Sequence, residues 1–132
     1  MQRILVVDDD PNERALLEAA LSLEGYTVRT AGDGDEALYV LDSERPDAVI
    51  TDLIMPGTDG LGVCRAIRAR PELEDMSIVA LTGGEYPQEL TGLCDVFLRK
   101  PVDVGRLVDT LQQLAASKLL NALPLVGHGL RW

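Results

Sequence analysis

The chain has 132 residues, which is the size of one domain, and 46% of them are hydrophobic. Its 22 acidic and 12 basic residues give a formal net charge of −10. We therefore expect no direct contact with nucleic acid or with an anionic membrane surface, because both would repel the chain. We also expect no secretory leader before the first apolar segment, which predicts a cytoplasmic protein with two reduced, buried cysteines, Cys64 and Cys94.

Short apolar runs alternate with amphipathic stretches along the chain. The runs predict strands at 3–7, 26–31, 48–51, 77–82 and 95–98, and most of them are continuous, which is typical of strands buried on both faces. Helical spacing of apolar residues predicts helices at 11–24, 35–43, 60–70 and 103–117. The first helix should bury one face, made of Leu16, Leu17, Ala20 and Leu21. This alternation predicts an α/β sandwich with a parallel sheet.

Two segments depart from this regular pattern. Residues 83–95 contain Gly83, Gly84, Pro87 and Gly92 and few apolar side chains, which predicts a short or irregular helix. Residues 118–132 follow the last predicted helix, and their apolar, glycine-rich end has two interpretations. It is either a frayed tail or the beginning of a linker, or its apolar side chains dock on the domain or on a partner.

Polar residues follow four of the predicted strands: Asp8, Asp9, Asp52, Thr82, Gly83 and Lys100. If the first and third strands are neighbours, the aspartates converge at one edge of the sheet. Two carboxylates about 4 Å apart repel by about 4 kcal/mol at an effective dielectric constant near 20, so the cluster needs a proton, a cation or a lysine. Mg²⁺ suits it, because this ion binds carboxylates together with phosphate oxygens. Lys100, Thr82 and the N–H of Gly83 are then donors for a phosphate, whereas Asp10 is expected only to cap a helix.

Four segments, VVDDD, TDLIMPGTDG, ALTGG and FLRKP, resemble the receiver domains of two-component response regulators, including those of chemotaxis. The resemblance covers about residues 3–117, so we expect a receiver domain at 1–117 and an extension or linker at 118–132. It implies a three-layer, flavodoxin-like fold with the strand order 2-1-3-4-5. It also implies that Asp52 accepts a phosphoryl group from a histidine kinase or a phosphotransfer protein. Mg²⁺ would be held by Asp9, Asp52 and the backbone carbonyl of Ile54, with help from Asp8.

The same resemblance implies a conformational switch. Thr82 would move toward the new phosphate and Phe97, where the family often has tyrosine, would rotate into the vacated space. Lys100-Pro101 resembles the family's cis peptide, which directs the lysine into the site. Such a domain catalyses its own phosphorylation and dephosphorylation but is not a multiple-turnover enzyme. Its downstream partner is a protein, and a homodimer is possible, although the shortened segment 83–95 changes the family's usual output and dimer surface.

Three other functions fit parts of the sequence. Gly32, Gly34 and Ala37 spell the G-x-G-x-x-A pattern of dinucleotide-binding oxidoreductases, with Asp52 about 20 positions further on. A phosphohydrolase would use Asp8 as nucleophile and Asp10 as acid. A receiver-like interaction module would work without phosphorylation. The first two leave Lys100 and most of the cluster unexplained.

Overall fold

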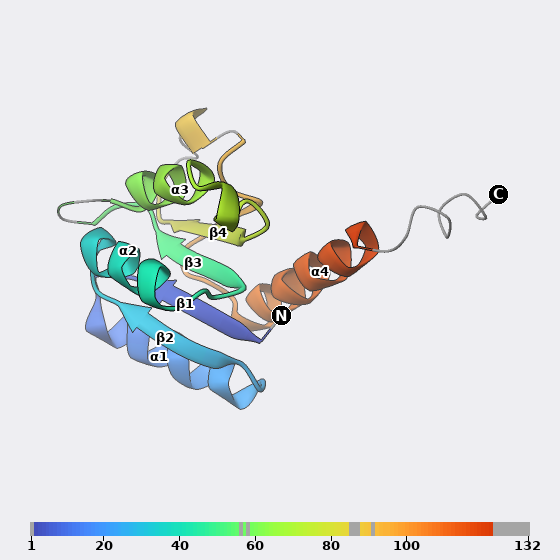
Figure 1. Cartoon of the computed structure of the whole chain (residues 1–132). Helices are drawn as coiled ribbons and strands as arrows, with labels where there is room; N and C mark the ends of the chain where they lie inside the picture. Colours follow the sequence, from blue (N-terminus) through green and yellow to red (C-terminus); the bar gives the residue numbers. More distant parts are fainter. Residues whose placement is uncertain (1, 56, 58, 85–87, 91, 123–132) are drawn as a thin grey trace.

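The computed structural model describes residues 2–55, 57, 59–84, 88–90 and 92–122 (Figure 1). Two short 3-10 helices, Pro71–Leu73 and Gln88–Leu90, precede the last two strands. The other elements are β1 (Arg3–Val7), α1 (Pro11–Leu23), β2 (Thr27–Ala31), α2 (Gly34–Ser43), β3 (Ala48–Asp52), α3 (Gly60–Arg68), β4 (Ser77–Thr82), β5 (Val96–Arg99) and α4 (Val104–Asn121). The predicted segments coincide with these elements apart from small differences at their ends, and α4 continues to Asn121 instead of ending at residue 117.

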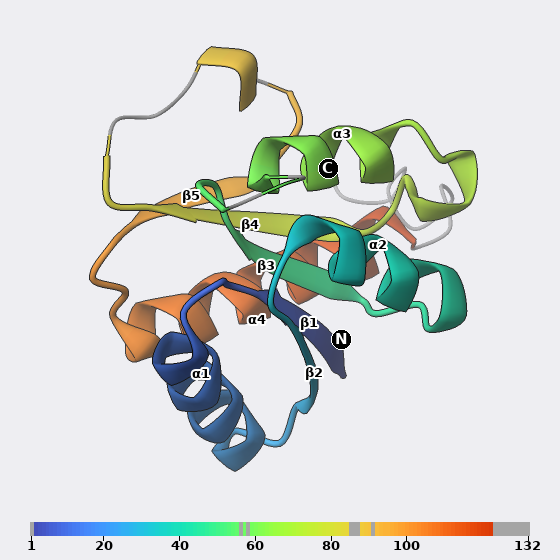
Figure 2. The ribbon, with the colours of Figure 1, turned by 90° about the vertical axis from the view of Figure 1, so that its left-hand side faces the viewer.

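The five strands form one parallel sheet in the order β2-β1-β3-β4-β5, which confirms the predicted fold. Helices α1 and α4 cover one face and α2 and α3 cover the other, so the domain has three layers (Figure 2). Because all strands are parallel, their carboxyl ends meet at a single edge of the sheet, where sites of open α/β folds lie.

The core has two halves, one on each face of the sheet. Along β1 the side chains alternate, so that Ile4 and Val6 pack toward α1 and α4 while Leu5 and Val7 pack toward α2 and α3. Strands β3 and β4 are buried along their whole length, which explains their continuous apolar sequences.

The buried face of α1 is narrower than the sequence predicts. Leu17 and Leu21 are buried, but Leu16 is 62% exposed, so its assignment to the buried face was wrong. The reason is that Leu16 lines an open pocket between α1 and the β5–α4 loop, together with Lys100 and Val102, so only part of its side chain is covered.

The crossover between β4 and β5 is short, as predicted, and its described part contains only the 3-10 helix Gln88–Leu90. Residues 85–87 and 91 lie outside the described part. Arg68 of α3 ties this crossover to the sheet: it donates to the carbonyl oxygens of Met76 at 2.9 Å and Leu93 at 2.8 Å, and to Asp95 Oδ2 at 2.9 Å. The same Asp95 oxygen accepts the Ile78 N–H at 2.7 Å, so one arginine joins the start of β4 to the end of the crossover that leads into β5.

Neither Cys64 nor Cys94 forms a disulfide, and only Cys64 is buried. Cys94 is half-buried because it lies in the segment that leads into β5 at the rim of the domain, so the expectation of full burial was wrong for it. The end of α4 projects beyond the sheet, with Leu119 and Leu120 exposed (Figure 1). The two interpretations of the tail fall mainly on residues 123–132, which lie outside the described residues. Within the described part of the chain, no helix has both the length and the apolar character of a membrane span.

Candidate functional site

The pairing of β1 with β3 brings two aspartates together. Val7 lies opposite Thr51 in this pairing, so Asp8 and Asp52 follow at the carboxyl edge side by side. Both side chains are largely buried, with 1% and 11% of their surface exposed. The prediction that these two strands are neighbours is thereby confirmed.

Lys100 lies at the centre of the cluster. Its Nζ donates to Glu13 Oε2 at 2.7 Å, to Asp52 Oδ2 at 3.1 Å and to Asp8 Oδ2 at 3.3 Å. Its backbone N–H donates to the carbonyl oxygen of Thr82 at 2.7 Å, which fixes the start of the β5–α4 loop beside β4. The predicted cis peptide Lys100-Pro101 is present. The lysine thus supplies one of the positive charges that the cluster needs.

Glu13 is a site residue that the sequence reasoning missed. Oxygens of Asp8, Glu13 and Asp52 all lie within 4.8 Å of one another, a group able to hold a metal ion. Asp9, which the sequence predicts as a metal ligand, is exposed and is not in this group of described residues. In the sequence Glu13 resembles an ordinary acidic residue in the first turn of a helix. The available signal was its place in the first turn of the helix that begins at the carboxyl end of β1.

The turn from β1 into α1 sets the direction of these side chains. Asp10 caps α1 as predicted, because its Oδ1 accepts from the N–H of Asn12 at 2.8 Å. Asp8 Oδ1 accepts from the N–H of Asp10 at 2.9 Å, and Arg14 donates to the carbonyl oxygen of Asp8 at 2.7 Å. The loop that carries Asp8 is therefore held from both sides.

Proton affinities in the cluster are shifted in opposite directions. Burial, followed by the hydrogen bond with Glu13, raises the pKa of Asp8 to about 6. The hydrogen bonds with Asp8 and Lys100 lower the pKa of Glu13. Burial opposes the charge on Lys100, but its bonds to Glu13 and Asp52 outweigh that effect and raise its pKa. At neutral pH the cluster therefore holds an ammonium among carboxylates that exceed it in number.

The remaining predicted residues lie around this cluster. Ile54 is 74% exposed, and its N–H donates to Asp52 Oδ1 at 3.3 Å. Thr82 is buried, and its Oγ1 accepts from the N–H of Gly84 at 3.1 Å. A Cβ on Gly83 would meet nothing within 4 Å, so the backbone there is open to an approaching ligand. Phe97 pairs with Ala80 and packs half-buried against the core on the side of α2 and α3.

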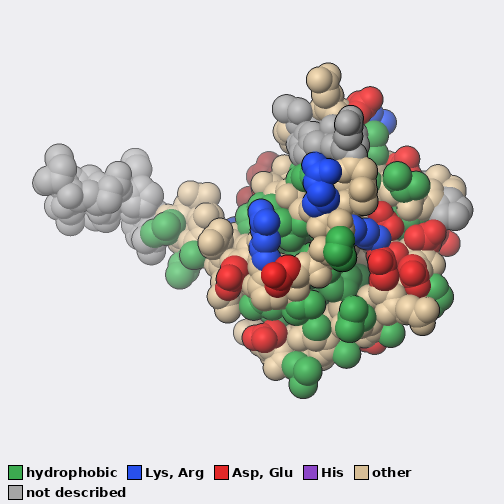
Figure 3. Space-filling view, turned by 180° about the vertical axis from the view of Figure 1, so that it is seen from behind, with side chains coloured by type: hydrophobic (Ala, Val, Ile, Leu, Met, Phe, Trp, Pro, Cys, Tyr) green, Lys and Arg blue, Asp and Glu red, His purple; other side chains and the backbone are tan. Residues whose placement is uncertain are grey.

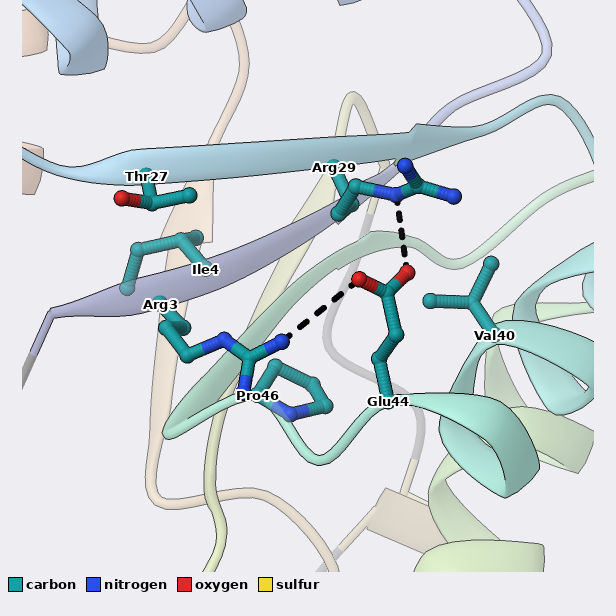
Figure 4. Close-up of a pocket in the computed structure, with 7 residues that line it drawn as sticks. All are labelled: Arg3, Ile4, Thr27, Arg29, Val40, Glu44 and Pro46. Carbon is teal, nitrogen blue, oxygen red and sulfur yellow. Dashed lines mark hydrogen bonds and ion pairs between the residues drawn. The ribbon is translucent and has the colours of Figure 1, made fainter.

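Pockets lie at both edges of the sheet, and the one at the carboxyl edge is lined in part by Lys100. One group of acidic side chains lies on the side away from the projecting end of α4, and others lie nearer to it (Figure 3). Another pocket lies where β1 and β2 begin, at the opposite edge, and is lined partly by Arg3, Arg29 and Glu44 (Figure 4). Glu44 bridges both arginines, at 3.5 Å and 2.9 Å, so its single charge compensates part of their positive charge.

A five-stranded parallel sheet with buried aspartates and a lysine at its carboxyl edge defines the receiver class of signalling domains. Residues 4–112 match the sequence model of the response regulator receiver domain, and the chain belongs to this family. Response regulator MprA of Mycobacterium ulcerans is 43% identical over 116 residues, which cover 85% of this chain and 49% of that protein. The chain therefore spans about half the length of the curated relatives that it matches.

Solved structures show the same relationship. Chemotaxis protein CheY4 of Vibrio cholerae is 33% identical, with a TM-score of 0.81 over 86% of this chain and 98% of the other. Response regulator TrrA of Thermotoga maritima, solved in complex with Mg²⁺–BeF, is 38% identical, with a TM-score of 0.79 over 86% and 99%. The chain is thus a response regulator receiver domain, and its acidic pocket is compatible with aspartate phosphorylation and with Mg²⁺. Because the chain belongs to this family, the receiver function replaces the oxidoreductase and phosphohydrolase hypotheses.

Proposed function

We propose that Asp52 accepts a phosphoryl group from the phosphohistidine of a histidine kinase or a phosphotransfer protein. The observation that carries this proposal is the contact of Asp52 Oδ2 with Lys100 Nζ at 3.1 Å, inside a cluster of carboxylates. Membership of the receiver family supports it. Asp52 lies where β3 ends, with its other oxygen accepting from the Ile54 N–H, so the carboxylate has a defined orientation.

The transfer exchanges one bond to phosphorus for another. A carboxylate oxygen of Asp52 forms the new P–O bond while the P–N bond of the phosphohistidine breaks, and its electron pair remains on the imidazole nitrogen. Asp52 loses no proton, because it reacts as the carboxylate. The ammonium of Lys100 stabilises the negative charge on the phosphoryl oxygens, and the Thr82 hydroxyl and Gly83 N–H are additional donors.

The donor set suits a divalent cation, because carboxylates outnumber the single ammonium in the cluster. We assign Asp8, Asp9, Asp52 and the backbone carbonyl of Ile54 as the residues that would hold Mg²⁺. When bound, the ion supplies positive charge to the phosphoryl oxygens. Asp9 follows Asp8 on the same loop and its side chain is exposed, so it can change rotamer toward the ion without disturbing the core.

We infer that phosphorylation switches protein interactions through Thr82 and Phe97. The Thr82 hydroxyl would exchange its contact with Gly84 for the phosphoryl group, and the half-buried ring of Phe97 would then pack further inward. The chain would act as a signalling module that modifies only itself, in the cytoplasm. We assign residues 1–117 to the receiver domain and 118–132 to an extension or linker, and a homodimer remains compatible with it.

A second candidate is an interaction module that no longer uses phosphate. The short β4–β5 crossover favours it, because this segment replaces a regular helix. The two candidates differ in their response to acetyl phosphate and to beryllofluoride.

The test measures the intact mass after incubation with acetyl phosphate, with and without Mg²⁺. We expect the mass of one phosphoryl group with Mg²⁺ and none after Asp52→Ala, whereas Asp109→Ala, a change on the exposed face of α4, should behave as the unmodified chain. Beryllofluoride with Mg²⁺ should shift NMR signals around Asp52. If neither reagent has an effect, the phosphoacceptor role is wrong and the interaction module takes its place.

A further inference from the structure

Glu13 makes the shortest contact of Lys100, and apart from its place in the group able to hold a metal ion it has no role in the proposed transfer to Asp52. The distance from Lys100 Nζ to Glu13 Oε2 is 2.7 Å, against 3.1 Å to Asp52 and 3.3 Å to Asp8. Helical side chains lean toward the N-terminus of their helix, and Glu13 lies in the first turn of α1. Its carboxylate is therefore directed at the carboxyl edge of the sheet, where the lysine lies.

The ammonium of Lys100 has no donor to spare. A lysine ammonium offers three N–H donors, and three carboxylates accept from this one. Phosphorylation of Asp52 frees one of these donors for a phosphoryl oxygen, and any further contact between the phosphoryl group and Lys100 requires another partner to leave.

Glu13 is the partner that leaves most easily. Its side chain is 43% exposed, whereas those of Asp8 and Asp52 are 1% and 11% exposed. A carboxylate that turns into water regains its hydration, and one that stays buried without a partner does not. Asp8 is also fixed by the N–H of Asp10, and Asp52 carries the phosphoryl group itself.

We propose that Glu13 is a positioning residue that competes with the phosphoryl group for Lys100. In the unphosphorylated domain it holds the ammonium, and phosphorylation displaces it into solvent. This inference rests on the proposed phosphorylation of Asp52. Loss of Glu13 should stabilise the phosphorylated state and its analogues. Loss of Lys100 should abolish phosphorylation and analogue binding alike.

The test compares Glu13→Gln, Glu13→Asp and Glu18→Gln at saturating Mg²⁺. Glu18→Gln removes the same charge from the exposed face of the same helix. Glu13→Asp keeps the charge but shortens the side chain by one methylene, which withdraws it from the ammonium. The readouts are the beryllofluoride dissociation constant by NMR and the initial rate of phosphorylation against acetyl phosphate concentration. In that reaction an Asp52 oxygen bonds to phosphorus and acetate leaves with the electron pair.

We expect Glu13→Gln to bind beryllofluoride about 5- to 10-fold more tightly and to half-saturate at a lower acetyl phosphate concentration. Glu13→Asp should change in the same direction, and Glu18→Gln should not change. If Glu13→Asp binds beryllofluoride like the unmodified chain, or if Glu18→Gln binds it like Glu13→Gln, only the overall charge of the domain matters. Competition between Glu13 and the phosphoryl group is then wrong. If the unmodified chain takes up no phosphoryl group and Asp52→Ala makes no difference, the proposed function itself fails.

Discussion

A Cβ atom placed on Gly60 would lie 1.9 Å from the backbone carbonyl oxygen of Asp52. The first residue of α3 therefore touches the end of the strand that carries the candidate phosphoacceptor, and the Gly60 N–H donates to the Leu53 carbonyl oxygen at 3.2 Å. Since the clashing atoms belong to the backbone, a side chain here cannot be accommodated by a rotamer change.

Gly60→Ala should therefore both destabilise the domain and impair its site. We expect the free energy of unfolding to fall by roughly 2 kcal/mol or more, because α3 or the end of β3 has to move. Urea unfolding measures this loss, and the rate of Asp52 phosphorylation should fall with it. Gly105→Ala is the control: its Cβ meets only the side-chain oxygen of Asp103, at 3.3 Å, near the start of α4. Equal stability of the two variants would contradict the close approach.

Arg68→Ala should loosen the β4–β5 crossover. The substitution removes the donor of the Met76 and Leu93 carbonyl oxygens and the cationic partner of the Asp95 carboxylate, and we expect the free energy of unfolding to fall by about 2 to 4 kcal/mol. Lysine at this position has one charged group instead of a fork of donors, so Arg68→Lys should recover only part of the stability. Urea unfolding measures the total loss of stability. Hydrogen exchange at the Ile78 and Asp95 amides shows whether the loss lies in this segment. Arg65→Ala, on the exposed face of α3, should have little effect on either measurement.

Asp8→Asn should stabilise the metal-free domain at neutral pH. The pKa of Asp8 is raised from 3.8 to about 6 in the folded state, so between these values the folded chain binds more protons than the unfolded chain. Stability then falls as the pH rises through this window, by up to about 2 to 3 kcal/mol above pH 6. The amide side chain removes this cost. The gain in stability of the variant should vanish near pH 4, because Asp8 of the folded unmodified chain is then protonated and uncharged like the amide.

The measurement for Asp8→Asn is urea unfolding from pH 4 to 8 without metal. Asp109→Asn, which removes an equal charge from the exposed face of α4, should follow the unmodified chain at every pH. In the unmodified chain Mg²⁺ affinity should decrease below pH 6, because the ion competes with the proton on Asp8. A stability difference that is independent of pH would contradict the raised pKa.

Much of the site could be predicted because strand ends in a parallel sheet share one edge. Asp8, Asp52 and Lys100 each follow an apolar run, so their convergence needed only the direction of the chain and the neighbourhood of β1 and β3. The cis peptide before Pro101 came from the family resemblance and is present. These features depend on chain order, which the sequence contains.

Features that depend on side-chain direction were not predictable in the same way. Glu13 joins the cluster because a helical side chain leans back over the preceding turn, and Leu16 is exposed because it faces an open pocket beside the β5–α4 loop. Periodicity places a residue on a face of a helix, but it does not say how much of that face the sheet covers. The network of Arg68 likewise depends on carbonyl groups that become neighbours only after folding.

Lys100→Ala should make the fold depend on a divalent cation. The ammonium is the partner of Asp8, Glu13 and Asp52, and without it we expect the metal-free domain to lose about 3 kcal/mol at neutral pH. Mg²⁺ should restore most of that stability and bind several-fold more tightly, since no fixed cation competes with it, while phosphorylation is lost. Lys118→Ala is the control, because Lys118 donates to the Asp47 carbonyl oxygen at the opposite edge of the sheet. Unfolding curves with and without Mg²⁺ decide the matter: if both variants lose equal stability and respond equally to the ion, Lys100 does not compensate the cluster.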